Sequence, residues 1–450
     1  MWTERWPRSL VLGTMLLVLL GVICTVVALP SGSDGIHRAD RMEFGVLGSE
    51  CDPGRVTALR TAGVELAQVD VGWDRLEPLP EHFDSSYASE LKTKIQNCRN
   101  AGLQVVLGLG LSYAPDWVSS LPNGKYLDQR GQSSPGSVPN IVFSEEVRSA
   151  FARYVARLAD LIGLDGITAI RVGTSEAGEL GYPVAGDTSN SYWAFGDSAQ
   201  TGHGLPPGVE RSPLPQWSPG SKTWNGVTVH AADVAEWFNW YSQSLAEAVI
   251  WQIGLVRSLG FQGTIHVLFA GKGVLPADLK SAIAARLDGT ADRDDGLETG
   301  LYYPHQMRYI ASAFPGGLVV ADVTGLDDAS AVDARKVTPR QDSCQPTDLY
   351  RDLMTTPEVG QWSASRWTIA NARQAGLDVV GENPGPPNSP GTGGNSRSDD
   401  LRAQMTYATQ YAIECGLAEL FWAFETDLFD PTEQVTLTDY ANVIKRTQQR

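Results

Sequence analysis

Eight short apolar runs alternate with amphipathic stretches from Phe44 to the end of the chain. Apolar runs bounded by turn residues are typical of buried strands, and their alternation with helical patterns is typical of repeated βα units. Several helical stretches end on a glycine that precedes the next run, as at Gly63, Gly102 and Gly260. The expected strands lie at 44–48, 64–71, 103–109, 167–173, 264–269, 318–323, 377–380 and 419–424, and the expected helices at 55–62, 85–101, 144–162, 231–259, 276–287, 361–375, 399–415 and 437–449.

Eight such units in order predict an α/β protein with a single (β/α)8 TIM barrel over residues 44–450. An open doubly wound sheet is the alternative arrangement of the same elements. The chain has 450 residues, 42% of them hydrophobic, so its length is sufficient for one barrel with insertions and requires no second domain. Long loops are expected after strands four and seven, at 184–229 and 384–396.

The formal net charge of −17 argues against nucleic acid as a partner, because phosphate binding needs clustered cations. An acidic surface is compatible with a neutral ligand and favours solubility. The six histidines show no paired spacing, and the acidic turn at 292–298 lacks the ligand spacing of a calcium loop. Neither a metal nor another cofactor is therefore expected, and the sequence leaves the oligomeric state open.

The first thirty residues have the pattern of a membrane or export segment. Arg5 and Arg8 precede an apolar stretch at 10–29, which is long enough to cross a bilayer and longer than a usual signal peptide core. Val26 and Ala28 can form a cleavage site, so residues 1–30 are expected to be a signal anchor or a cleaved signal peptide. The basic flank predicts that the polar tether at 31–43 and the barrel lie outside the cell, with this segment as the sole membrane contact.

Glutamates follow two of the expected strands. Glu176 and Glu179 come just past the fourth run, and Glu382 follows the seventh. The carboxyl ends of barrel strands share one face, and that face carries the catalytic residues of barrel enzymes. Two carboxylates on either side of a sugar are what cleavage of a glycosidic bond requires. These positions predict a glycoside hydrolase with a carbohydrate substrate.

Several segments resemble known barrel glycosidases. VELAQVDVGWDRLEP at 64–78, AGLQVVL at 101–107 and PDW at 115–117 resemble family 42 β-galactosidases of the retaining clan, and the resemblance extends over about residues 44–430. GELGYP at 178–183 is similar to the Gly-Glu-Leu-Arg-Tyr-Pro signature of β-amylases, with Gly181 in place of the arginine. In β-amylases that glutamate is the catalytic acid, which implies this role for Glu179. In the retaining clan the acid follows an asparagine, and here Ser175 precedes Glu176.

The surrounding residues favour Glu179 over Glu176 as the acid. Glu179 precedes Leu180 and Tyr182, and an apolar setting raises the pKa of a carboxyl group by desolvation, as a general acid needs. Glu176 lies closer to the strand end, where it can itself be the acid, bind a sugar hydroxyl or pair with Arg171.

Glu382 is expected to be the second catalytic carboxylate, with Asn383 placed to orient it. Its alternative role is to hold a neighbouring loop. Whether it attacks the anomeric carbon or activates water depends on the separation of the two carboxylates, about 5 Å for retention and more for inversion. The sequence leaves both mechanisms, the sugar and the linkage open.

Candidates for substrate contact lie at strand ends and on the first long loop. Aromatic rings there can stack on the C–H faces of a sugar, and each can equally well pack in the core. The candidates are Asp70, Trp73 and Trp117 after strands two and three, Trp193 and Trp217 in the loop 184–229, Asn383 beside Glu382, and Trp422 in the last strand, where the resemblance implies an aromatic floor of the sugar site.

Four cysteines lie outside the apolar N-terminal stretch, and an exported chain can oxidise them. Cys51 and Cys344 both follow strands, which places them on the catalytic face of a barrel. Cys98 and Cys415 lie near helix ends, towards the opposite face. We therefore expect a Cys51–Cys344 bridge and two buried thiols.

Two functional classes remain in play. The first is an exported or surface-anchored glycoside hydrolase acting on a neutral oligo- or polysaccharide. The alternative is a catalytically silent barrel that binds glycans at the cell surface, a class favoured by the missing asparagine before Glu176 and by the expected anchor.

Overall fold

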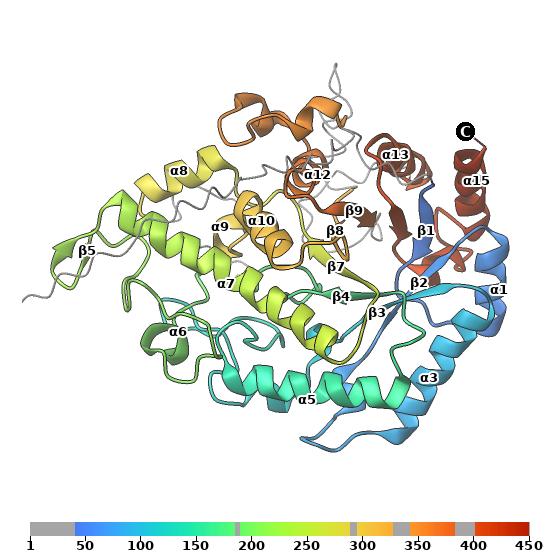
Figure 1. The fold of residues 1–450 in the computed structure, drawn as a ribbon, viewed down its shortest axis with the longest axis horizontal. Coiled ribbons are helices and arrows are strands. Elements are labelled where there is room, and N and C mark those ends of the chain that lie inside the picture. Colours follow the sequence, from blue (N-terminus) through green and yellow to red (C-terminus); the bar gives the residue numbers. More distant parts are fainter. Residues whose placement is uncertain (1–40, 185–189, 289–294, 327–342, 383–400, 450) are drawn as a thin grey trace, which may run out of the picture. The chain divides into compact units, whose positions relative to one another are not determined.

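The computed structural model describes residues 41–184, 190–288, 295–326, 343–382 and 401–449. Within them, parallel strands close into an eight-stranded barrel in the order β1-β10-β9-β8-β7-β4-β3-β2, with helices around it (Figure 1). Strands that follow one another in the barrel are therefore neighbours in space, which confirms the (β/α)8 barrel and excludes the open sheet. The barrel strands are β1 (Glu43–Val46), β2 (Leu66–Asp70), β3 (Gln104–Gly108), β4 (Ala169–Val172), β7 (Thr264–Phe269), β8 (Val319–Val323), β9 (Asp378–Glu382) and β10 (Glu419–Trp422).

The outer layer consists of helices, with shorter elements in the loops between them. The longer helices are α1 (Pro53–Thr61), α3 (Ser85–Asn100), α5 (Glu145–Ile162), α7 (Ala231–Ser258), α8 (Pro276–Ala284), α10 (Tyr303–Ala313), α12 (Ala364–Gln374), α13 (Leu401–Glu414) and α15 (Leu437–Gln448). The shorter elements are α2 (Trp73–Leu76), η1 (Leu111–Tyr113), α4 (Asp116–Ser119), α6 (Asp197–Thr201), the antiparallel hairpin of β5 (Thr223–Trp224) and β6 (Val227–Thr228), α9 (Asp295–Glu298), η2 (Pro346–Leu349), η3 (Pro357–Gln361) and α14 (Glu425–Leu428).

The unit between β7 and β8 differs from the prediction by one helix. The expected helix is present as α8, but a second helix, α10, contacts both α7 and α12 in the outer layer. Its buried residues include Tyr303, Met307 and Ile310, which follow helical spacing. The pattern is short and begins with Pro304 and His305, which concealed it in the sequence.

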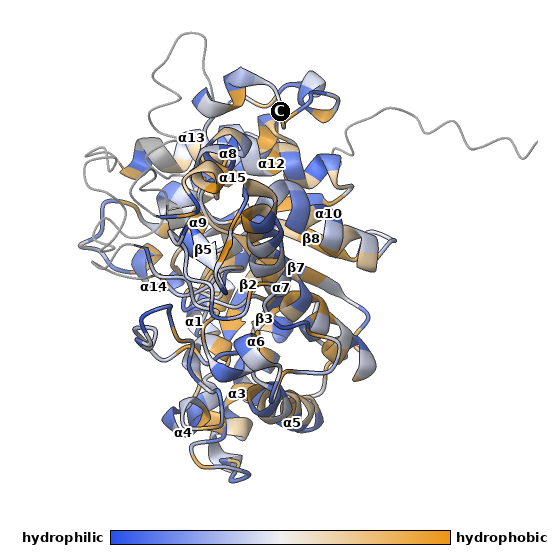
Figure 2. Cartoon of the chain, turned by 90° about the vertical axis from the view of Figure 1, so that its left-hand side faces the viewer, coloured by the Kyte–Doolittle hydropathy of each residue, from blue (hydrophilic) through white to orange (hydrophobic). Residues whose placement is uncertain are grey.

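The inside of the barrel is more polar than is usual for this fold, in which bulky branched residues dominate. Alternate residues of a strand face inward, and six of these inward positions form a small apolar cluster of Leu47, Leu66, Val106, Ala169, Phe421 and Ala423. The main apolar core lies between strands and helices, and Figure 2 shows hydrophobic residues along the strands while the helices carry both kinds. Other inward positions hold Gln68, His266 and Asp322, all buried. The charged groups of the barrel interior thus sit directly beneath its mouth.

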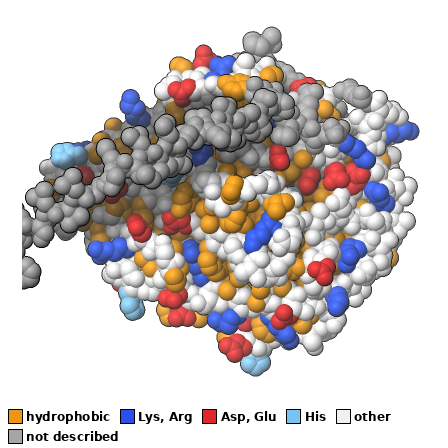
Figure 3. All heavy atoms as spheres, viewed as in Figure 1, with side chains coloured by type: hydrophobic (Ala, Val, Ile, Leu, Met, Phe, Trp, Pro, Cys, Tyr) orange, Lys and Arg blue, Asp and Glu red, His pale blue; other side chains and the backbone are white. Residues whose placement is uncertain are grey.

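On the face shown in Figure 3, lysines and arginines are scattered among acidic residues rather than gathered into one patch. Within the residues that the structure describes, no helix has both the length and the apolar character needed to cross a bilayer. The expected export segment at 1–30 lies outside those residues.

The predicted Cys51–Cys344 bridge is wrong. The bonds are Cys51–Cys98 and Cys344–Cys415, each with its Cα atoms 5.2 Å apart. After β1 the Ser49 amide donates to the Gln68 carbonyl of β2 (2.8 Å), and two residues later Cys51 meets Cys98 of α3 instead of pointing over the mouth. Each bridge therefore joins a loop to a residue in or just after a helix of the outer layer.

Replacing Cys51 and Cys98 together by alanine should lower the free energy of unfolding by about 4 kcal/mol. The bridge spans 47 residues and restricts the unfolded chain. The matched replacement of Cys344 and Cys415, which span 71 residues, should have a similar effect. Urea unfolding followed by tryptophan fluorescence measures both, and an unchanged midpoint in either double variant would contradict the assigned pairing.

Candidate active site

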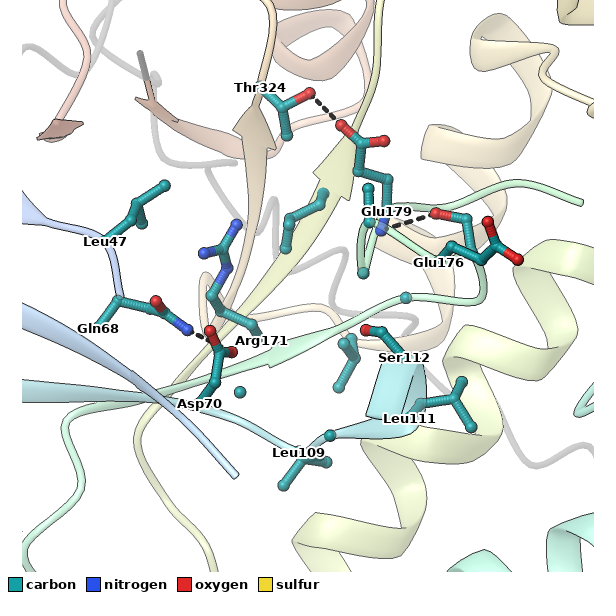
Figure 4. A pocket seen from close by; sticks show the side chains of 18 of the residues that line it. Leu47, Gln68, Asp70, Leu109, Leu111, Ser112, Arg171, Glu176, Glu179 and Thr324 are labelled. Atoms are coloured by element: carbon teal, nitrogen blue, oxygen red, sulfur yellow. Dashed lines mark hydrogen bonds between the residues drawn. The ribbon is translucent and has the colours of Figure 1, made fainter. Parts of the chain in front are cut away.

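A cavity of about 360 Å³ opens at the carboxyl ends of the barrel strands (Figure 4). This volume falls in the range of small-molecule sites. Residues at or after the ends of the barrel strands line it, together with Gln252 from α7. The predicted residues Asp70, Glu176, Glu179 and Glu382 all belong to this lining. The structure therefore brings the three candidate catalytic glutamates to one cavity.

The loop between β4 and Glu179 is held in a tight turn. The Thr174 hydroxyl donates to the Gly181 carbonyl (2.8 Å) and accepts from the Gly181 amide (2.9 Å). The Thr174 amide donates to the carbonyl of Glu179 (2.8 Å). A Cβ at Gly173 would stand 1.9 Å from the Gly178 carbonyl oxygen, so only glycine allows this close approach. The turn fixes the backbone of Glu179 beside the barrel mouth.

Arg171 and Glu382 form the central ion pair of the cavity. The Arg171 Nη2 atom donates to Glu382 Oε2 at 2.6 Å, and the two side chains are only 12% and 14% exposed. Burial alone would lower the pKa of Arg171, but nearby carboxylates raise it, in descending order of effect Glu382, Asp322, Asp70 and Glu179. One guanidinium therefore balances a group of carboxylates from β2, β8, β9 and the loop after β4.

Burial raises the pKa of both candidate catalytic carboxyls. For Glu179, burial is opposed by a hydrogen bond from the Thr324 hydroxyl (2.5 Å) and by the charge of Arg171. Burial raises the pKa of Glu382 as well, Arg171 opposes that change, and the charges of Asp322 and Glu179 add to it. A carboxyl group whose pKa is raised keeps its proton nearer to neutral pH, as a general acid must.

Glu176 points to a different part of the cavity wall. Figure 4 shows its carboxyl group turned away from Arg171, whereas that of Glu179 is turned towards Thr324. A Cβ built at Gly136 would fall 1.3 Å from Glu176 Oε1, so the carboxylate lies against the loop that contains Gly136. Burial raises the pKa of Glu176. Of the two glutamates, Glu179 is the one that interacts with the ion pair.

Asp70 is fixed by its neighbours in β1, β2 and β3. Gln68 Nε2 donates to Asp70 Oδ1 (2.7 Å), and the Gly48 amide donates to Gln68 Oε1 (2.9 Å). A Cβ at Gly108 would stand 2.3 Å from Asp70 Oδ1, so the glycine leaves the space that the carboxylate occupies. Asp70 is therefore presented to the cavity in one orientation.

The aromatic rings that line the cavity are Tyr113 and Phe424, which are 49% and 41% exposed. Tyr113 ends η1 after β3, and Phe424 follows β10. Burial raises the pKa of Tyr113, and the charge of Asp70 adds to the effect. Neither ring was predicted from the sequence, because tryptophans near strand ends were chosen as the candidates for substrate contact.

The predicted tryptophans lie outside the cavity lining. Trp73 stacks on Tyr154 with ring centroids 4.7 Å apart, and Trp117 meets Trp73 edge to face. Trp422 is buried and lies 5.8 Å from the ring of Tyr440 on α15, because Phe421 and Ala423 take the inward positions of that strand.

The two loop tryptophans are also buried. Trp217 packs on Trp237 of α7 with centroids 5.6 Å apart, and the Trp193 amide donates to the Tyr241 hydroxyl (3.0 Å). Both fix the long insertion after β4 to helix α7. Asn383 lies outside the described residues.

Nothing in the described part of the chain gathers three or more histidine, cysteine or acidic side chains as metal ligands. Thr324 and Gln252 are cavity residues that sequence reasoning missed. Thr324 lies just past β8, two residues after Asp322, so period-two alternation from the strand would have identified it. Gln252 comes from the middle of α7 and donates to the Gly173 carbonyl (2.8 Å), a contact that no local pattern signals.

Replacing Arg171 by methionine should destabilise the protein by about 3–5 kcal/mol near pH 8, because it leaves buried carboxylates without their cation. A carboxyl group with a raised pKa stabilises the fold at low pH, and this contribution is lost as pH rises towards the folded-state pKa. Removing Arg171 raises the pKa of Glu382 and Glu179 further. The loss of stability in Arg171→Met should therefore grow with pH and be small near pH 4.5.

Thermal unfolding of both proteins between pH 4.5 and 8 measures this dependence. Arg148→Met is the matched control, because Arg148 is buried and donates to the carbonyls of Ile141 and Val142 instead of to carboxylates. Its destabilisation should not vary with pH in this range. An Arg171→Met effect that is equally flat would contradict the role of Arg171 as counter-charge.

Comparison with models of protein families and with curated protein sequences gives no match. Solved structures with a similar fold include the catalytic domain of β-amylase from Paenibacillus polymyxa, 16% identical with a TM-score of 0.54 over 91% of this chain and 99% of that one. The β-galactosidase from the psychrophilic Marinomonas ef1 is 13% identical (TM-score 0.54), and that from the Antarctic haloarchaeon Halorubrum lacusprofundi is 16% identical (TM-score 0.52). The matches cover 90% and 91% of this chain but only 60% and 58% of those β-galactosidase chains. The chain therefore has a (β/α)8 barrel fold like that of these glycoside hydrolases.

Proposed function

We propose that this protein is a glycoside hydrolase that cleaves O-glycosidic bonds of a neutral oligo- or polysaccharide. The observation that carries the proposal is the convergence of Glu179 and Glu382 on one cavity around Arg171. Glycosidic cleavage requires a carboxyl group that donates a proton and a second carboxylate on the other side of the sugar. The likeness of the barrel to β-amylase and β-galactosidase structures supports the same chemistry.

Glu179 is the general acid in this proposal. Burial raises its pKa, which keeps the proton available for the leaving-group oxygen. The hydrogen bond from Thr324 holds one carboxyl oxygen and leaves the other for the substrate. Glu176, whose carboxyl group is turned away from Arg171, is placed to bind a hydroxyl group.

Glu382 is the second carboxylate. Burial raises the pKa of Glu382 to about 8, and its ion pair with Arg171 opposes that change by favouring the charged form, which either attacks the anomeric carbon or takes a proton from water. When the bond breaks, the leaving oxygen takes the proton of Glu179 and the anomeric carbon bonds to Glu382 or to the activated water. The product anomer, read by NMR on a cleaved substrate, distinguishes these two routes.

The cavity also favours a neutral substrate. Asp70, Glu176, Glu179 and Glu382 are carboxylates of the lining, and Arg171 is already engaged by Glu382, Asp70 and Glu179. This balance repels anionic sugars. Tyr113 and Phe424 offer exposed ring faces to a sugar, and Asp70 offers an acceptor for its hydroxyl groups.

We also propose that the barrel works outside the cell. The bridges Cys51–Cys98 and Cys344–Cys415 support an oxidising compartment. The apolar stretch at 10–29, preceded by Arg5 and Arg8, supports export or anchoring by residues 1–30. Fractionation of cells that produce the full chain, with and without residues 1–30, tests this localisation.

Glu179→Gln should lower kcat/KM by about a hundredfold to ten-thousandfold on natural glycosides and much less on aryl glycosides with good leaving groups. The reason is that a leaving group of low pKa departs without protonation. Glu382→Gln should abolish hydrolysis of every substrate. Steady-state kinetics over a series of aryl glycosides and oligosaccharides measures both effects.

Glu176→Gln is the matched control in that series, since it changes another carboxyl of the same cavity. It should show no dependence on the leaving group. If Glu176→Gln shows that dependence while Glu179→Gln stays active, the acid has been assigned to the wrong glutamate. Binding of glycans without hydrolysis would instead identify a silent barrel.

Phe424→Ala should raise KM while leaving the melting temperature nearly unchanged, because the ring is partly exposed at the cavity. Trp217→Ala should have the reverse effect, a loss of about 3–5 kcal/mol of stability with little change in KM of the folded protein. Kinetics and thermal unfolding of both variants make the comparison. A KM effect confined to Trp217→Ala would show that the insertion, and not Phe424, holds the sugar.

A further inference from the structure

A polar group lies inside the barrel beneath the cavity and has no part in the chemistry described so far. Asp322 on β8 is 1% exposed and precedes the cavity residue Thr324 by two positions on the same strand. His266 on β7 is fully buried, with Nδ1 3.4 Å from Asp322 Oδ2. On its other side, His266 Nε2 lies 3.7 Å from Glu419 Oε2 of β10. These three side chains form a row across the barrel interior.

Asp322 is a buried carboxyl group without hydrogen-bond partners in the part of the chain that the structure describes. Neither of its oxygens has a hydrogen-bond donor within the described residues. Buried polar atoms are normally satisfied, so an exception in a folded protein calls for an explanation. A carboxylate whose charge is not spread over hydrogen bonds acts strongly on the groups around it, because the protein interior screens weakly.

The groups around Asp322 come from the strands on either side of β8 and from β4. His266 of β7 lies 3.4 Å from Asp322 and pairs in register with Arg171 of β4, while Glu382 follows Val380, the register partner of Asp322 on β9, by two positions. Glu419 on β10 lies beyond His266. Asp322 thus acts electrostatically on the ion pair and on both proposed catalytic carboxyls.

We propose that Asp322 is a positioning residue for the catalytic groups. His266 contacts it from below, Asp322 attracts Arg171, and its negative charge acts on Glu179 and Glu382. This role rests on the proposed function, because it presupposes that Glu179 and Glu382 carry out the hydrolysis. Arg171 favours the charged form of both carboxyls, and Asp322 offsets that effect. Without the negative charge of Asp322, Glu179 would lose its proton at a lower pH. It could then no longer donate a proton over much of the pH range in which the enzyme works.

The test is the pKa of the Glu382 carboxyl, measured by NMR in protein carrying a ¹³C label at glutamate Cδ. Glu382→Gln identifies the signal by its disappearance. Asp322→Asn, which keeps the shape and removes the charge, should lower that pKa by on the order of one pH unit. Asp322→Ser provides a second neutral side chain in case the asparagine variant does not fold, and it should show the same downward shift.

Glu419→Gln is the matched control, because it also removes a carboxylate beside His266. The Glu419 side chain is more exposed than that of Asp322, 17% against 1%, so its removal should shift the Glu382 pKa less than removal of Asp322 does. An unchanged Glu382 pKa in both Asp322 variants would overturn the proposal. So would an equal shift in Glu419→Gln, since the effect would then come from the total charge of the barrel.

Kinetics provide a second readout once a substrate is found. Asp322→Asn should move the pH profile of kcat/KM to lower pH and reduce kcat more than KM, whereas a purely structural role would lower the profile without moving it. If the wild-type protein cleaves no glycoside, the proposed function fails, yet the NMR comparison still decides whether Asp322 sets the Glu382 pKa.

Discussion

The ion pair between Arg171 and Glu382 is the interaction on which the candidate site depends. Buried charges are tolerated only when they are paired, and removing one partner of such a pair is strongly destabilising. Arg171 meets this requirement for several carboxylates at once, from β2, β8, β9 and the loop after β4. The closed barrel makes this possible, because its strands aim alternate side chains at one axis. Closure of the barrel therefore both forms the fold and brings the carboxylates within reach of Arg171.

Strands and loops each supply side chains at the mouth of the barrel. Asp70, Arg171 and Glu382 lie on barrel strands that are each hydrogen-bonded to both neighbouring strands. The tight turn after β4 supplies Glu179, and the segment after β10 supplies the exposed ring of Phe424. The long insertion after β4 packs its tryptophans on α7 and stiffens the wall behind Glu179. Rigid support of this kind preserves catalytic geometry, in which an error of about 1 Å is costly.

The sequence predicted the barrel and most of its elements because the period of the apolar pattern is a local signal. It also placed Glu179 and Glu382 on one face, since strand ends in a barrel share a face. Trp73, Trp117 and Trp422 were harder, because an aromatic near a strand end can face either the cavity or the helix layer. One residue of register decides that choice, and the actual inward positions at β10 are Phe421 and Ala423. The prediction of the disulfide pairing failed because no local sequence pattern shows that the chain after β1 brings Cys51 to α3.

The position of a bound sugar tests this account most directly. A crystal structure of the Glu179→Gln variant with an oligosaccharide that the wild-type protein cleaves would show where the scissile bond lies. The account predicts the anomeric carbon between residue 179 and Glu382, with a hydroxyl group at Asp70 and a ring face on Phe424. A sugar bound only on the outer surface, with the cavity above Arg171 left unoccupied, would contradict it.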